Sequence, residues 1–161
     1  MGYSASVWVN FGVGLAAIAG ALVGLLFVAA SVRSSALAAS RGLSSRAAQT
    51  LVLFLTSVVV ALALLAPQPD AALGWELVGW AFVSGTAMLI LDRRAGHEPT
   101  QRAERFVQHY APNSITSVLL AVAGATFLAK HGGGLYWLLP TVAGSLLGGV
   151  VSAWFFLISD N

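Results

Sequence analysis

Two glycine-containing motifs in this chain match signatures of enzyme chemistry. Gly12-x-Gly14-x-x-Ala17 matches the dinucleotide-binding fingerprint, which needs a preceding strand and a turn that presents N–H groups to a pyrophosphate. His131-Gly132-Gly133-Gly134 matches the oxyanion motif of esterases, which works together with a G-x-S-x-G nucleophile elbow. The first motif lies inside an uninterrupted apolar run, and the sequence contains no G-x-S-x-G. We therefore interpret them as a helix-packing motif and a loop tip, and we expect no enzymatic activity.

The histidine and cysteine content argues against a metal centre. The chain has no cysteine, and its three histidines (His97, His109 and His131) have no standard zinc-ligand spacing. His131 is also separated from the other two by an apolar run. We predict no bound metal and no cofactor.

One acidic side chain, Glu76, falls inside an apolar run long enough to cross a membrane. Carboxylates inside a membrane are energetically expensive and are therefore candidates for function. The alternative interpretation is that the carboxylate simply reaches the headgroup region, because Glu76 lies near the start of its run. With Asn10 at the same depth, and with Ser84 and Thr86, it would give an oligomeric channel a sparse polar pathway.

The elements that position these residues are predicted to be membrane-spanning helices. Of the 161 residues, 58% are hydrophobic and 9% are charged, whereas soluble domains carry about a quarter charged residues. Apolar runs cover residues 11–31, 48–66, 73–91, 114–129 and 135–158, and about 20 residues suffice to cross a bilayer. We predict an all-α integral membrane helical bundle of five transmembrane helices, forming a single transmembrane domain over residues 1–161. Because the fourth run is short, four crossings plus a re-entrant hairpin are the alternative.

The basic residues predict the orientation of these helices. Cytoplasmic loops of membrane proteins are enriched in Lys and Arg. An arrangement with the N-terminus outside and the C-terminus inside leaves only Lys130 outside and puts every arginine inside: Arg33, Arg41, Arg46, Arg93, Arg94, Arg102 and Arg105. We therefore expect a multi-pass membrane protein with these arginines near the lipid headgroups of the inner face. Basic residues confined to short loops also argue against nucleic-acid binding.

Residues 92–112 form the one long polar loop, and residues 95–112 of this loop are predicted to be an amphipathic connector. Within it, Ala103, Phe106, Val107 and Tyr110 follow the i, i+3, i+4, i+7 spacing of an amphipathic helix. We predict an inner-face connector that lies along the membrane surface.

Small residues recur at every fourth position in the first and last apolar runs. These rows consist of Gly12, Ala16, Gly20 and Gly24, and of Gly144, Gly148 and Ser152. On a helix this spacing makes a ridge where another backbone can approach closely. The two ridges either pack on each other within one chain or form a subunit contact.

Hydroxyl side chains complete the predictions for the second apolar run. Ser44 or Ser45 is expected to cap the second helix. Thr50, Thr56 and Ser57 are expected to bond back to the preceding helical turn, so they need no functional partner.

The segment Gly24-Leu25-Leu26-Phe27-Val28-Ala29-Ala30-Ser31, after a glycine-rich first span, resembles short multi-span membrane proteins of actinobacterial-type bacteria. Some of these carry the label of membrane-protease modulators. The resemblance covers the first span and the following loop. It implies a bacterial inner (plasma) membrane and no particular functional residues.

Two functions fit the sequence. The first is a non-enzymatic accessory or regulatory subunit of a membrane complex, which assembles through its glycine-rich helix faces. The alternative is a homo-oligomeric channel or small-solute transporter. The lipid bilayer and either further copies of the chain or a larger membrane complex are the expected partners.

Overall fold

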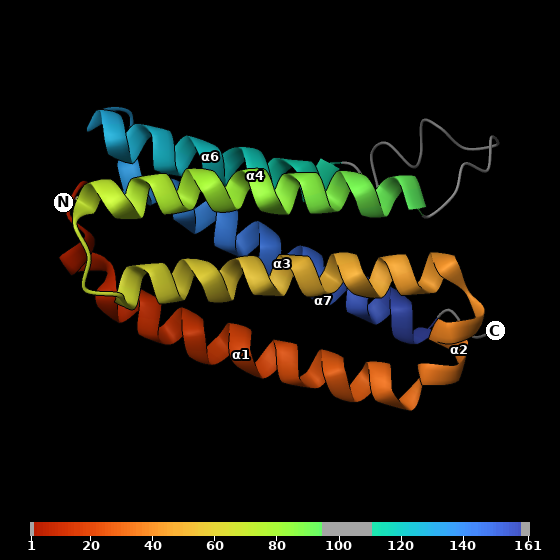
Figure 1. Cartoon of the computed structure of the whole chain (residues 1–161). Helices are drawn as coiled ribbons and strands as arrows, with labels where there is room; N and C mark the ends of the chain where they lie inside the picture. The colour runs from red at the N-terminus through yellow and green to blue at the C-terminus, as the bar shows by residue number, and fades with distance from the viewer. Residues whose placement is uncertain (1, 95–110, 159–161) are drawn as a thin grey trace.

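The described part of the chain is built from helices. The computed structural model describes residues 2–94 and 111–158. Its five long helices are α1 (Val9–Val32), α3 (Arg41–Leu65), α4 (Asp70–Arg94), α6 (Ala111–Ala129) and α7 (Leu138–Ile158), shown in Figure 1. The short helix α2 (Ser34–Ala39) joins α1 to α3, and the 3-10 helices η1 (Ala5–Trp8) and η3 (Gly134–Trp137) precede α1 and α7. No strand occurs in these ranges, and the all-α prediction is confirmed.

The bundle is of the membrane type. Four helices are long and apolar enough to cross a membrane, and α6 supplies a shorter apolar stretch, Ile115–Ala129. With 19 residues, α6 is about 28 Å long, close to the ~30 Å of a hydrocarbon core. Figure 1 shows α6 and α7 each as a continuous helix. Helices suit the hydrocarbon core of a membrane, because each backbone N–H and C=O group finds its hydrogen-bond partner within the same segment.

Helix α3 lies at the centre of the arrangement. It contacts α1, α4 and α7, while α6 contacts α4 and α7. Helices α3, α4, α6 and α7 therefore close a ring, and α1 packs against the outside of α3 (Figure 1). Half of the apolar window of α3 is buried, against 17% of that of α1. The first span is thus peripheral, whereas its row of glycines alone predicts a central packing helix.

The core between the ring helices is filled by large apolar side chains. Each contributing helix supplies at least one that is almost completely buried: Leu53 and Phe54 from α3, Leu73 and Leu77 from α4, Leu120 from α6, and Leu138 from α7. Burying a side chain of this size stabilises a fold by about 1.5–3 kcal/mol relative to water, although in a bilayer the gain comes from packing density instead.

Several hydroxyl groups inside the bundle are hydrogen-bonded. Thr50 and Thr56 donate to the carbonyl oxygens of Arg46 and Val52, at 3.0 and 2.8 Å, as the back-bonding prediction requires. Ser57 differs, because its Oγ lies 2.6 Å from Oγ of Ser145 on α7. The buried hydroxyl therefore joins two helices instead of bonding to its own.

Helix α3 begins seven residues earlier than the apolar run predicts. Its cap is Ser40, whose Oγ accepts from the backbone N–H of Leu43 at 3.4 Å, and not Ser44 or Ser45. Serine is a preferred N-cap, and the first turn of a helix tolerates polar residues near a membrane surface. Arg41 and Arg46 consequently lie on α3 itself rather than in a loop.

Two ends of the bundle can be distinguished, and we name them after the predicted orientation. The outer end holds η1, the α3–α4 connection and the turn between α6 and η3 (Figure 1). The inner end holds α2 and the end of α4, so Arg33, Arg46 and Arg93 lie there, whereas Lys130 lies at the outer end. The N-outside orientation itself stays a prediction. Residues 95–110 of the predicted connector lie outside the described residues, and α6 begins at Ala111.

The N-terminal segment closes the outer end of the bundle. The backbone N–H of Leu135 donates to the carbonyl oxygen of Gly2 at 3.0 Å, and that of Gly133 donates to Tyr3 Oη at 3.0 Å. Gly132, Gly133 and Gly134 all have positive φ, which glycine adopts without a steric penalty. A Cβ on Gly134 would also lie 2.8 Å from the Tyr3 ring. We call these contacts between residues 2–3 and 133–135 the N-terminal cap.

Candidate functional site

The predicted ridge of α1 is buried against α3 at its start and exposed at its end. A Cβ on Gly12 would lie 3.1 Å from Leu64 Cβ, so this glycine packs tightly on α3. Ala16 is half-buried, whereas Gly20 and Gly24 are exposed and have no atom within 4 Å of an added Cβ. The cause is geometric, because positions four apart drift by about 40° per step around a helix of 3.6 residues per turn. Only the start of the ridge therefore faces α3.

A second row of small residues on α1 is exposed along its whole length. Its members follow a 4-3-4-3-4 spacing, and all of them are exposed: Asn10, Gly14, Ala17, Ala21, Gly24 and Val28. This spacing repeats every seven residues, as in the contact seam of a coiled coil. Gly14, like Gly20 and Gly24, has nothing within 4 Å of an added Cβ. We call this row, together with the flanking Gly20, the α1 face.

The small residues of α7, in contrast, lie close to side chains of α3 and α6. An added Cβ on Gly149 would collide with the Phe54 ring of α3, and one on Gly144 would lie 3.3 Å from Thr116 Cγ2 of α6. Ser145, next to Gly144, carries the bond to Ser57. Gly148 and Ser152 are half-buried. Gly144 of the predicted row and the neighbouring Ser145 and Gly149 are thus covered within the chain. Because α1 meets α7 at few points, the two predicted ridges do not pack on each other.

The four predicted pathway residues do not converge within one chain. Asn10 is exposed on α1, and Thr86 is exposed on α4. Ser84 is buried, with Oγ bonded to the Ala81 carbonyl oxygen at 3.2 Å and placed 3.3 Å from Ser117 Oγ on α6. Glu76 lies on another face of α4. These four residues therefore form no continuous polar path within one chain.

Neither enzyme-like motif has the geometry that its chemistry needs. Residues 12–17 lie within the continuous helix α1, and η1 rather than a strand precedes them. In the glycine turn, the N–H groups of Gly133 and Leu135 are already bonded in the N-terminal cap. His131 is exposed, with Nδ1 placed 2.7 Å from the Ala129 carbonyl oxygen. Within residues 2–94 and 111–158 there is no group of three side chains that would ligate a metal; His97 and His109 lie outside these ranges.

No family model matches this chain, and comparisons with curated proteins and with solved structures found no match.

The predicted basic group lies partly on described surface. Arg46 and Arg93 are exposed and Arg33 is half-buried at the inner end. The side chains of Arg41 and Arg94, and residues Arg102 and Arg105, lie outside what the structure describes. Between these arginines, Gln49 Nε2 donates to Asp92 Oδ1 at 2.6 Å and joins α3 to α4. This contact could not be predicted from a local sequence pattern, because its partners are 43 residues apart.

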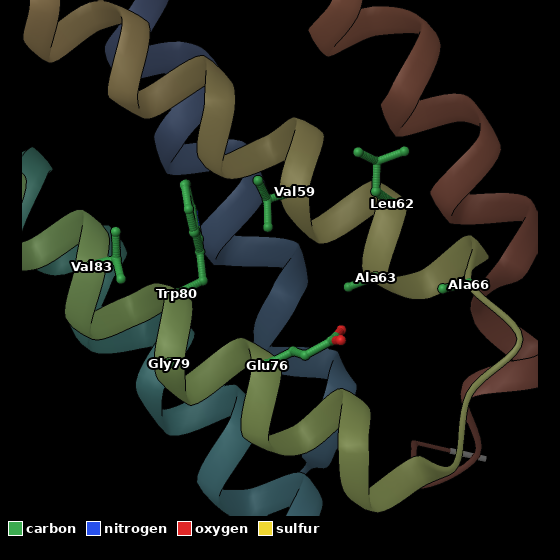
Figure 2. A pocket seen from close by; sticks show the side chains of 8 residues that line it. All are labelled: Val59, Leu62, Ala63, Ala66, Glu76, Gly79, Trp80 and Val83. Atoms are coloured by element: carbon green, nitrogen blue, oxygen red, sulfur yellow. The ribbon is translucent and has the colours of Figure 1, made fainter.

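A second glutamine–carboxylate contact joins the same two helices near the outer end. Gln68 Nε2 donates to Glu76 Oε2 at 2.8 Å and to the carbonyl oxygen of Ala63 at 2.9 Å. Between this contact and Trp80 an apolar groove opens between α3 and α4 (Figure 2). Glu76 therefore stands at one end of a groove on the bundle surface.

Proposed function

We propose that this protein is a non-enzymatic integral membrane subunit of a bacterial plasma membrane that assembles through the α1 face. In this proposal it acts as an accessory or regulatory component of a membrane complex, and the assembled unit contains at least two copies of the chain. The observation that carries the proposal is the open space at Gly14, Gly20 and Gly24 on a helix that is only 17% buried across its apolar window.

Helices associate in lipid through forces other than the hydrophobic effect. Lipid tails are as apolar as leucine, so association depends on close packing and on polar contacts. Small residues allow two backbones to approach, and an exposed row of them gives up that packing unless a second helix covers it. The α1 face supplies this row over about five turns, from Asn10 to Val28.

A second copy of α1 is the partner that fits the row best. Two chains inserted in the same orientation present their α1 faces in parallel, related by a two-fold axis along the membrane normal. The heptad-like spacing of the row is compatible with such a parallel pair. Asn10 would then face its counterpart, and one asparagine in an apolar seam specifies register through a mutual hydrogen bond.

The test replaces Gly20 and Gly24 together with isoleucine. Their side chains would project from the α1 face and hold the second backbone away, so we expect the oligomer to dissociate to monomer. Size-exclusion chromatography with light scattering, in detergent and in nanodiscs, measures the change. Ala143→Ile is the matched control, because Ala143 is exposed on α7 and lies outside the face. An unchanged oligomer in the double variant would contradict the proposal.

Cysteine cross-linking adds a test at single-residue precision, since the natural chain has no cysteine. Ala17→Cys is expected to form disulfide-linked dimers in native membranes, whereas Ala143→Cys is expected to stay monomeric. The reverse pattern would place the contact on α7 and overturn the assignment to α1.

A further inference from the structure

The groove between α3 and α4 is open along one side of the bundle. Its volume is about 530 Å³, within the usual range of small-molecule sites. It is lined mainly by apolar side chains, including Val59, Ala63 and Val83, and by the backbone at Gly79. An added Cβ on Gly79 would have no atom within 4 Å, so the groove is open there. Leu62 on its rim is 58% exposed, and the groove therefore opens sideways, toward lipid.

The two ends of the groove differ in chemistry. At the inner end, Trp80 Nε1 donates to Thr56 Oγ1 at 3.2 Å and satisfies the one polar group of the indole. At the outer end, the Glu76 carboxylate points into the space between the helices, as Figure 2 shows. The bond from Gln68 to Oε2 orients this carboxylate. Across the described ranges no basic side chain pairs with Glu76.

The position of Glu76 suits contact with a lipid headgroup. It lies six residues, about 9 Å, from the outer end of α4 at Asp70. Side chains on a helix tilt toward its N-terminus, which for α4 is the outer end. The carboxylate therefore reaches toward the headgroups while the rest of the groove extends into the hydrocarbon layer. Asp70 adds a second negative charge at this end, so an anionic headgroup is disfavoured and an ammonium is favoured.

An acyl chain is the occupant that the surroundings supply. An empty groove forfeits van der Waals contacts along its walls, and an apolar groove at hydrocarbon depth does not hold water. A helix, about 10 Å across, does not fit between α3 and α4, which contact each other along the ring. We propose that the groove binds one phosphatidylethanolamine of the outer leaflet, with an acyl chain along Gly79 and the ammonium on Glu76. This site does not depend on assembly through α1.

Native mass spectrometry of the full chain measures the bound lipid directly. Protein in mild detergent is equilibrated with an equimolar mixture of phosphatidylethanolamine and phosphatidylglycerol. We expect one phosphatidylethanolamine per chain to be retained in preference to phosphatidylglycerol. Glu76→Gln keeps a partner for Gln68 but removes the charge, and it should lower this preference about fivefold, the factor expected for one exposed ion pair of ~1 kcal/mol.

A second variant tests the acyl chain independently of the headgroup. Gly79→Leu places a side chain in the groove and should abolish retention of both lipids. Ala125→Leu, on the exposed face of α6, is the matched control and should retain phosphatidylethanolamine as the natural chain does. If Gly79→Leu fails to fold by circular dichroism, Val83→Trp fills the same groove from one turn further along α4.

Three outcomes would overturn the proposal. The first is equal retention of the two lipids by the natural chain. The second is an unchanged lipid preference in Glu76→Gln or unchanged retention in a folded groove-filling variant. The third is efficient disulfide formation between chains carrying Gly79→Cys in native membranes, which would show that a second copy of the protein covers the groove.

Discussion

Helices α1 and α7 both carry regularly spaced small residues, which other helices of the chain cover on α7 and leave open on the α1 face. On α7, Gly149 lies against the Phe54 ring and Gly144 against Thr116. On α1, Gly20 and Gly24 have no neighbour within 4 Å of an added Cβ. A small-residue row thus predicts that a close approach is sterically allowed, and it does not predict which surface makes the approach.

The neighbouring helices explain the difference. Helix α7 lies in the ring between α3 and α6, so both of its flanks meet another helix. Helix α1 has one neighbour along its length, α3, and the buried positions Gly12, Leu15, Ala19 and Leu26 already form that contact. The opposite side of α1 is left to lipid or to a partner. The same sequence pattern therefore acts in folding on one helix and is available for assembly on the other.

The largest expected effect comes from replacing one glycine on each helix with leucine and comparing the free energies of unfolding. Gly149→Leu would force its side chain into the Phe54 ring, and overpacking of this kind destabilises by about 3 kcal/mol. Gly24→Leu meets no atom of its own chain and should change stability by less than about 0.5 kcal/mol. Unfolding in mixed micelles of increasing sodium dodecyl sulfate content, followed by circular dichroism, measures both.

Equal stability losses in these two variants would contradict the comparison between the rows. Gly24→Leu should instead weaken the oligomer, which separates folding from assembly within one pair of variants. A Gly149→Leu protein with unchanged stability would mean that α7 does not pack on Phe54 in the membrane.

The fold could be predicted from the sequence because it follows from a strong local signal. Apolar runs of transmembrane length predict helices, and the prolines at 67 and 69 separate the second from the third. The helix starts were less predictable, since Arg41 and Arg46 interrupt the apolar pattern although Ser40 caps the helix ahead of them. Hydropathy identifies where a helix is buried in lipid, whereas capping decides where it begins.

The candidate sites were less predictable because they depend on the rotation of each helix and on distant partners. Glu76 was identified from its charge, but the groove beside it requires the relative placement of α3 and α4. The α1 face was predicted only in part. A row of residues at four-residue spacing winds slowly around the helix, so the row that begins at Gly12 does not follow the α1 face. Tyr3 and Gly133 are 130 residues apart, and no local pattern predicts their bond.

A medium effect is expected from the hydroxyl pair that fastens α7 to α3. Ser145 Oγ donates to the Val142 carbonyl oxygen at 3.1 Å, so in the pair its oxygen accepts the proton of Ser57. Ser145→Ala leaves that proton in a buried site and should cost about 1 kcal/mol, more than Ser57→Ala. A double-mutant cycle should give a coupling of ~0.6 kcal/mol, typical of hydrogen bonds between membrane helices. A coupling of zero would show that α7 is held by packing at its glycines alone.

The smallest effect concerns the attachment of α1 at the N-terminal cap. Tyr3→Phe removes the acceptor of the Gly133 N–H, a bond worth about 1 kcal/mol, and this amide should then exchange its hydrogen about fivefold faster. Tyr136→Phe is the matched control, because the Tyr136 ring packs on Trp8 and its hydroxyl makes no hydrogen bond within the described residues. Hydrogen-exchange mass spectrometry of the segment around residues 130–136 measures both. Faster exchange in Tyr3→Phe with an unchanged oligomer would show that α1 is fastened at its end and contacts its partner along its face. Equal exchange in the two variants would mean that packing on α3 alone holds α1 in place.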